Sequence, residues 1–239
     1  MNLISLIKGR ATFAHGGVHP QEHKEETAHL TIRRLPFASK LVVPLSQHKG
    51  APAKPIVKVG EEVVRGEPIA EADGHVSVPM HAPATGRVSL IDLWPTAEGP
   101  KAPAIIIDVY DAASQQILYE EEVDILHLAP GEIVQHVKDA GLVGLGGAAF
   151  PSHVKMLPPA GKRIHTLVVN GCECEPYLTC DHRVMLENTE ALLRGVRIAM
   201  RATGAQRALI GVEDNKMDAV RTIREKLKKN DPIEVRAVE

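Results

Sequence analysis

Hydrophobic residues occur in short β-branched runs in the first half of the chain and at helical spacing in the second half. Frequent Gly and Pro separate the short runs, which is typical of a compact all-β unit with many turns. Between residues 41 and 109 these runs read LVVPL, KPIVKV, EPIAEA, GHVSVPM, GRVSLI and AIIIDV.

From residue 130 onwards the pattern predicts helices and strands in alternation. Pro130-Gly131-Glu132 is a helix start, and Gly141 is placed to close that helix. The remaining predicted elements are strand 165–170, helix 184–203, strand 208–212, helix 216–229 and strand 233–238. This alternation predicts right-handed crossovers and a parallel sheet with helices on both faces.

The flanking segments complete the predicted organisation. We expect an N-terminal arm at 1–40, a β domain at 41–112, a linker at 113–130 and an α/β domain at 131–239. In the arm, His15, His19 and His23 recur every four residues, but Gly16-Gly17 argues against the helix that a metal site would need. We interpret them as solvated or hydrogen-bonded histidines.

Composition excludes several classes of function. The chain has 239 residues, enough for two domains, and a net charge of −2 with 3% aromatic residues, which argues against a nucleic-acid partner. It contains no apolar run near the ~18 residues that cross a bilayer and no signal peptide. We expect a chain without a transmembrane segment, on the cytoplasmic side.

A glycine-rich segment, GLVGLGGAAFPSHVK, carries the first candidate site. Gly144, Gly146 and Gly147 can turn backbone N–H groups toward an anion or a flat ring, and Lys155 adds a positive charge. The spacing fits neither a P-loop nor the dinucleotide fingerprint. A tight turn between packed elements is the alternative.

A second candidate site follows the first predicted strand of the α/β domain. Ligands of parallel sheets bind beyond the carboxyl ends of the strands, where this chain has NGCECEPYLTCDH. Asn170 can hydrogen-bond a planar ligand and Glu175 can accept from a carboxamide, while Glu173 and Glu213 lie on the same rim. The alternative is that these carboxylates cap turns and the next helix.

Three cysteines crowd into the same loop. Cys172, Cys174 and Cys180, with His182, raise the possibility of a zinc or cluster site, but their spacing matches no standard ligand set. We assign no metal ligand and no catalytic acid or base.

Two stretches of the β domain, VKVGEEVVRGEPIAEADG and VSVPMHAPATGRVSLI, resemble the barrel-sandwich hybrid of biotinyl and lipoyl carriers. Such carriers need a lysine at the hairpin tip, and there is no lysine between Lys58 and Lys101. We therefore expect a scaffold.

Several motifs together resemble the C subunit of the Rnf electron transport complex. They are GGVHPQEHK, QHKGAPAKPIVKVGEEVVRGEPIAEADG, GLVGLGGAAFPSHVK, VVNGCECEPYLTCDHR and LIGVEDNK, in order from about residue 15 to the end. More distantly, the second domain looks like the flavin-carrying, NADH-oxidising subunit of respiratory complex I. The resemblance implies a Rossmann-like FMN- and NADH-binding α/β domain.

The resemblance also implies roles for individual residues. The three glycines would approach the flavin or the dinucleotide, Phe150 would stack on a ring of NADH, and Lys155 would lie against the flavin. Asn170 would hydrogen-bond FMN and Glu175 would contact the nicotinamide. Four residues depart from the complex I pattern and make the NADH site less secure. Leu145 replaces an arginine, Ala149 a glycine, Cys172 an aspartate and Pro158 an aromatic residue.

The implied function is that of a peripheral subunit of a membrane-bound, ion-translocating NADH:ferredoxin oxidoreductase. NADH would reduce FMN, and two 4Fe–4S clusters would carry electrons toward ferredoxin with other Rnf subunits. The ligands of these clusters are absent from this sequence, so we expect an N-terminal fragment. The alternatives are the flavin-free A subunit of the sodium-pumping NADH:quinone reductase, which would be structural or contact quinone, and a docking module without a ligand.

Overall fold

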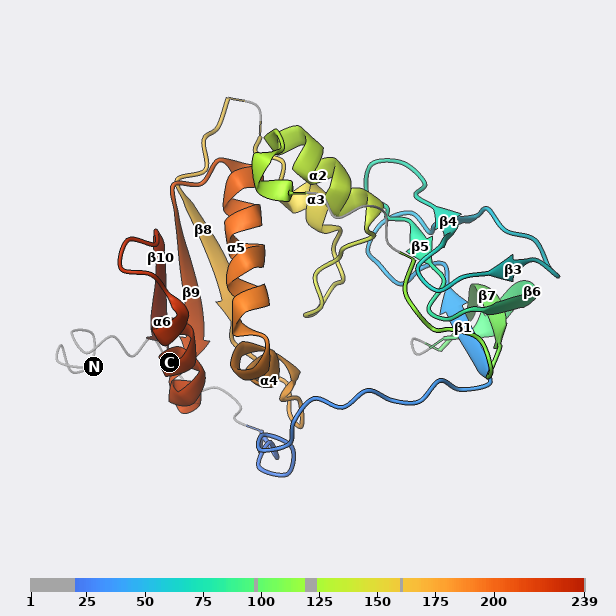
Figure 1. The fold of residues 1–239 in the computed structure, drawn as a ribbon, viewed down its shortest axis with the longest axis horizontal. Helices are drawn as coiled ribbons and strands as arrows, with labels where there is room; N and C mark the ends of the chain where they lie inside the picture. The colour runs from blue at the N-terminus through green and yellow to red at the C-terminus, as the bar shows by residue number, and fades with distance from the viewer. Residues whose placement is uncertain (1–19, 97–98, 119–123, 160, 239) are drawn as a thin grey trace. The chain divides into compact units, whose positions relative to one another are not determined.

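The computed structural model describes residues 20–96, 99–118, 124–159 and 161–238 (Figure 1). Backbone contacts divide the chain into two compact units. The β unit contains residues 34–163 with 201–203, and the α/β unit contains the described residues up to 33 with 164–200 and 204–238. The domain boundaries expected from the sequence stay a prediction.

The strands of the β unit form two small antiparallel sheets. The larger, in the order β1-β7-β6-β3, consists of β1 (Lys40–Pro44), β3 (Glu62–Val63), β6 (Gly86–Pro95) and β7 (Lys101–Val109). The smaller, in the order β2-β4-β5, consists of β2 (Lys54–Pro55), β4 (Pro68–Glu71) and β5 (Met80–His81). The predicted strands at 54–59 and 74–80 are reduced to the two-residue strands β2 and β5. Pro55 and Pro79 account for this because proline lacks the N–H that a ladder needs.

Strand β7 supplies the centre of the β-unit core. Ile105 and Ile107 are fully buried and pack with Val88 of β6 and Ile69 of β4. At Gly86, a Cβ atom would lie 2.3 Å from the carbonyl oxygen of Asp108, so the close approach of β6 and β7 requires glycine there.

Three short helical elements also belong to this unit: η1 (Ile125–His127), α2 (Pro130–Asp139) and α3 (Ser152–Lys155). The predicted start of α2 is confirmed: Pro130 opens it, and the Glu132 carboxylate accepts a hydrogen bond of 2.8 Å from the N–H of Ala129. Gly141 follows the helix with φ +67°, as the predicted stop requires. The glycine-rich segment runs between α2 and α3.

The α/β unit contains a parallel three-stranded sheet in the order β10-β9-β8. Its strands agree with the predicted ones to within about a residue at each end. The elements are β8 (Thr166–Gly171), α4 (Cys180–Glu187), α5 (Thr189–Thr203), β9 (Arg207–Glu213), η2 (Asp214–Lys216), α6 (Met217–Lys226) and β10 (Ile233–Val238).

The prediction that helices cover both faces of this sheet is wrong for the described residues. Residues of α4, α5 and α6 join one core with Ile210 and Val212 of β9, whereas Val168 on the other face of β8 is 69% exposed. The strands follow one another in a single direction across the sheet. Right-handed crossovers then put every helix on the same face. None of the described helices is long and apolar enough to cross a membrane.

The helix predicted at 184–203 is two helices. Asn188 has non-helical angles (φ −122°, ψ 33°), and the Thr189 hydroxyl donates to the carbonyl of Met185. Such side chains compete with helical hydrogen bonding, so the chain breaks here. Helix α6 ends at Lys226 instead of 229 because Leu227 is extended (ψ 137°).

We expect Ile107→Ala to lower the free energy of unfolding by about 2–5 kcal/mol, because it leaves a cavity in a fully packed core. Leu93→Ala in β6, where the side chain is 54% exposed, serves as the control and should change it by less than about 0.5 kcal/mol. Denaturant unfolding measures both, and equal effects would contradict the assigned core.

Candidate functional site

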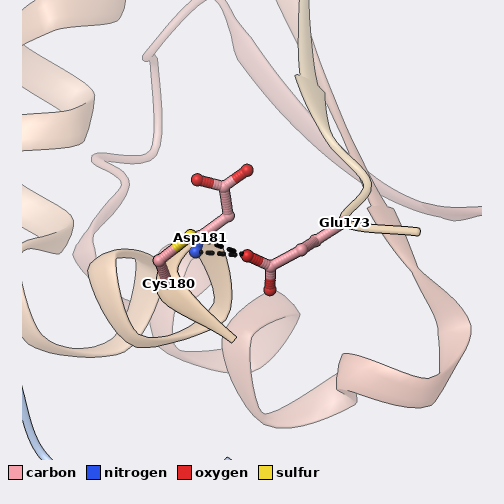
Figure 2. A group of neighbouring side chains, drawn as sticks. All are labelled: Glu173, Cys180 and Asp181. Carbon is pink, nitrogen blue, oxygen red and sulfur yellow. Dashed lines mark hydrogen bonds between the residues drawn. The ribbon is translucent and has the colours of Figure 1, made fainter. Parts of the chain in front are cut away.

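The last two residues of β8 and the loop that follows them, together residues 170–179, are organised around the carboxylate of Glu173. We call this segment the acidic loop. The Glu173 side chain is 2% exposed and points at the first turn of α4 (Figure 2). It accepts hydrogen bonds from the Cys180 thiol (3.0 Å), the Asp181 N–H (2.9 Å) and the His182 N–H (3.5 Å). The carboxylate thus satisfies the free donors of the helix N-terminus and opposes the positive end of its dipole.

The backbone of Glu173 connects the same loop to two lysines. Its N–H donates to the Glu213 carboxylate (3.2 Å), which forms an ion pair with the buried Lys216. Its carbonyl accepts a hydrogen bond from the buried ammonium of Lys24. The ends of β8 and β9 are therefore joined by one polar network.

This network shifts the pKa values of two neighbouring carboxyls in opposite directions. Burial alone would raise the pKa of Glu173, but the hydrogen bonds from Asp181, Cys180 and His182 and the charge of Lys24 lower it overall. Burial raises the pKa of Asp181, and the negative charges of Glu173 and Glu175 raise it further. Glu173 is the fixed anion of the loop.

The cysteines do not lie in a typical metal site. Within the described residues, one group that could hold a metal consists of Glu173, Cys180 and Asp181, whose ligand atoms lie within 4.8 Å of one another. The Cys180 thiol donates to Glu173, which together with burial raises the pKa of Cys180. The hydrogen bonds from the Cys180 thiol and the Asp181 N–H make the Glu173 carboxylate a cap of the first turn of α4.

Two polar side chains of the acidic loop are exposed at its rim. The Asn170 side-chain oxygen accepts from the Cys172 N–H (3.0 Å), which leaves its amide nitrogen as the donor to offer, and Glu175 is exposed. A pocket of about 110 Å³ lies at this strand end, with both Asn170 and Asp181 in its lining. It is large enough for a small ring or an ordered water cluster only.

The glycine loop, residues 141–151, is an open backbone turn in the β unit. The Gly144 N–H donates to the carbonyl of Phe150 (2.9 Å), and Gly147 has φ +71°. A Cβ atom at Gly146 or Gly147 would meet nothing within 4 Å, whereas one at Gly144 would lie 2.8 Å from the Lys155 ammonium. Lys155 of α3 therefore lies at the loop, and Gly146 and Gly147 are exposed.

Ala149 occupies a strained position in this loop. Its φ is +46°, in the left-handed region that favours glycine, and its carbonyl accepts from the N–H of Lys49 (3.1 Å). Alanine at this position is one of the expected departures from the complex I pattern, and the backbone angle explains why glycine suits it.

The predicted site residues fall into two groups. The β unit brings together Gly144, Gly146, Gly147, Phe150 and Lys155, and the α/β unit holds Asn170, Glu173, Glu175 and Glu213. Glu173 and Glu213 are engaged in the internal network, which favours the alternative that they support the loop. That all nine contact one ligand stays a prediction.

Sequence reasoning missed the residues that stabilise the acidic loop. Lys24 and Lys216 are both buried, and the Nε2 atom of His182 lies at hydrogen-bond distance (3.0 Å) from the Asp218 carboxylate. The sequence signal for Lys24 was its place in the motif GGVHPQEHK, which no local rule connects with residue 173. His23 of that motif is stacked on Tyr177; His15 and His19 lie outside the described residues.

Two family models match this chain. Residues 12–111 match the RnfC barrel sandwich hybrid domain, and residues 137–239 match the Nuo51 FMN-binding domain. The chain is 39% identical over 213 residues to the C subunit of the Na(+)-translocating ferredoxin:NAD(+) oxidoreductase complex of Acetobacterium woodii, a match that covers 87% of this chain and 47% of that protein. Over most of its length the chain is therefore similar to Rnf complex C subunits.

Other relatives in the RnfC family agree. Identity is 38% over 209 residues to the C subunit of the proton-translocating ferredoxin:NAD(+) oxidoreductase complex of Clostridium ljungdahlii, a match that covers 87% of this chain and 46% of that protein. Identity is 36% over 237 residues to the C subunit of the ion-translocating oxidoreductase complex of Edwardsiella ictaluri, a match that covers 98% of this chain and 29% of that protein. The chain thus spans about half the length of the first two RnfC relatives.

The two-part fold expected for an RnfC protein, a barrel-sandwich hybrid and a Rossmann-like α/β domain of complex I flavin-subunit type, is confirmed by the two family models. A crystal structure of a NAD+-reducing NiFe hydrogenase overlaps 48% of this chain and 21% of that chain, at 26% identity. Its TM-score of 0.40 is too low for an argument about the fold.

We expect Glu173→Gln to lower the free energy of unfolding at pH 7 by about 1–3 kcal/mol, because the α4 donors lose an ionised acceptor. The pKa of Glu173 is lowered in the fold, so its stabilisation is present above the ordinary glutamate pKa and is lost as the pH falls through the lowered value. The difference from wild type should therefore shrink below about pH 4. Glu175→Gln, at an exposed residue of the same loop, is the control for denaturant unfolding.

We expect Ala149→Gly to raise the free energy of unfolding of the β unit by about 0.5–1 kcal/mol, because glycine adopts a positive φ without strain. Ala148→Gly changes the neighbouring residue, whose φ is not positive, and should give no gain. Equal behaviour of the two variants in denaturant unfolding would show that Ala149 is not strained.

Proposed function

We propose that this chain carries the FMN- and NADH-binding site of an Rnf-type complex, a membrane-bound, ion-translocating NADH:ferredoxin oxidoreductase. The observation that carries the proposal is the open glycine loop with the Lys155 ammonium at Gly144, inside a segment that matches an FMN-binding domain. The names of the relatives, which include ferredoxin and NAD(+), support the same activity for the whole protein.

The residues present fit a flavin phosphate and ring. The exposed backbone at Gly146 and Gly147 leaves room for an anion or a flat ring at close range, and a nearby lysine suits negative charge. On the α/β unit, the amide of Asn170 can donate to a ring carbonyl, and the exposed Glu175 can accept from a carboxamide. In this proposal, Phe150 stacks on a ring of NADH.

When bound, FMN would supply the chemistry, by accepting two electrons as a hydride and releasing them singly. The residues of this chain bind and orient: Lys155 stabilises negative charge, Asn170 fixes the ring and the Glu173 network holds the loop in place. None of the residues discussed needs to act as a general acid or base. We assign transfer through iron–sulfur clusters to ferredoxin, and docking to the other subunits at the cytoplasmic face of the membrane, to the whole protein.

We expect Lys155→Ala to weaken FMN binding roughly tenfold, or about 1.4 kcal/mol, because it removes the cation at the glycine loop. Lys162→Ala, at an exposed lysine in the same region, should leave the affinity unchanged. Calorimetric or fluorescence titration measures both variants against wild type. Unchanged affinity of Lys155→Ala would remove the glycine loop from the flavin site, and a wild type that binds no FMN would favour the flavin-free alternatives.

A further inference from the structure

Residues 22–32 of the N-terminal arm pack against the acidic loop and α4, about 150 positions away in the sequence (Figure 1). These residues and the acidic loop belong to the same α/β unit. The contacts involve backbone groups on both sides, so the arm fixes the course of the loop as well as covering it. None of them is used by the proposed binding of FMN.

Lys24 makes the most buried of these contacts. Its side chain is 8% exposed, and its ammonium donates to the carbonyl oxygen of Glu173. Burying a charged group is costly unless it is paired, and the neighbouring carboxylates of Glu173 and Asp181 give it opposite charge. An exposed lysine would add solubility without the free-energy cost of burial. The burial of Lys24 therefore indicates that it stabilises the structure around it.

A second contact holds the outer part of the loop. The rings of His23 and Tyr177 are stacked, with centroids 5.0 Å apart and an angle of 10° between them. Both residues have positive φ values, +49° and +66°, which cost free energy and persist only where surrounding contacts enforce them. The Tyr177 N–H donates to the carbonyl of Glu22 (2.7 Å) and so supplies part of that enforcement.

Further hydrogen bonds continue the contact along the arm. The hydroxyl of Thr179 donates to that of Thr27 (3.0 Å), which in turn donates to the carbonyl of Tyr177 (3.3 Å). At the other end, Arg183 of α4 donates to the carbonyl of Ala28 (3.2 Å). The arm is thereby connected to both ends of the segment between Glu173 and α4.

We propose that Lys24 is a positioning residue that, with His23, holds the acidic loop in the conformation that binds the flavin or the dinucleotide. The loop part of this inference rests on the contacts above, and the ligand part rests on the proposed function. The exposed residues 174–178 have few anchors of their own, so without the arm they would have to be ordered when the ligand binds. That ordering would reduce affinity without the loss of any direct contact.

The test compares Lys24→Met with Lys24→Arg, which keeps the charge, and with Lys58→Met at an exposed lysine of the β unit. Hydrogen exchange of amides 174–179 in the ligand-free full chain should become about tenfold faster in Lys24→Met than in wild type. Exchange in the core strand β9 should stay unchanged. Lys24→Arg should restore most of the protection, and Lys58→Met should behave as wild type.

The same variants are then titrated with FMN. We expect affinity to fall about tenfold in Lys24→Met and to recover in Lys24→Arg, with a thermal midpoint close to wild type. Faster loop exchange with unchanged FMN affinity would overturn the ligand part of the inference. Unchanged loop exchange would overturn the positioning role itself, whether or not wild type binds FMN.

A milder variant covers the case in which Lys24→Met unfolds the α/β unit. His23→Leu removes the stacking partner of Tyr177 at a half-buried position and leaves Lys24 in place. Faster exchange confined to residues 174–179 supports the positioning role, and exchange identical to wild type contradicts it. If wild type fails to bind FMN, the proposed function fails, while this exchange measurement still decides the role of the arm.

Discussion

The acidic loop of the α/β unit depends on the hydrogen bonds of the buried Glu173 carboxylate. Glu173 accepts from the first turn of α4 through its oxygens, while its own N–H and carbonyl join Glu213 and Lys24. One residue thus fixes the start of a helix, the end of β9 and the course of the acidic loop. Because these donors are ordered in advance, the exposed Asn170 and Glu175 are presented on a rigid support.

Each of the two units carries its own group of candidate residues. The β unit contributes a glycine loop with a nearby lysine, and the carbonyl of the strained Ala149 accepts a hydrogen bond from Lys49, which lies between β1 and β2. The α/β unit contributes amide and carboxylate groups at strand ends.

The local parts of this account could be predicted from the sequence, and the remote ones could not. Short-range rules predict the glycine turn, the helix start at Pro130 and the strands β8, β9 and β10. The break at Asn188 was missed because the apolar period continues through it, and the single covered face was missed because alternation alone does not give strand order. The contact of Lys24 with Glu173 spans 149 positions and has no local signal.

The central claim is that the glycine loop and the acidic loop each carry flavin-binding residues. The most direct measurement is a titration of the isotopically labelled chain with FMN, followed by NMR through the amides of Gly144, Gly146 and Gly147 and the side-chain amide of Asn170. The account predicts that FMN shifts the signals of both loops. Signals of either loop that stay unchanged at saturating FMN would contradict it.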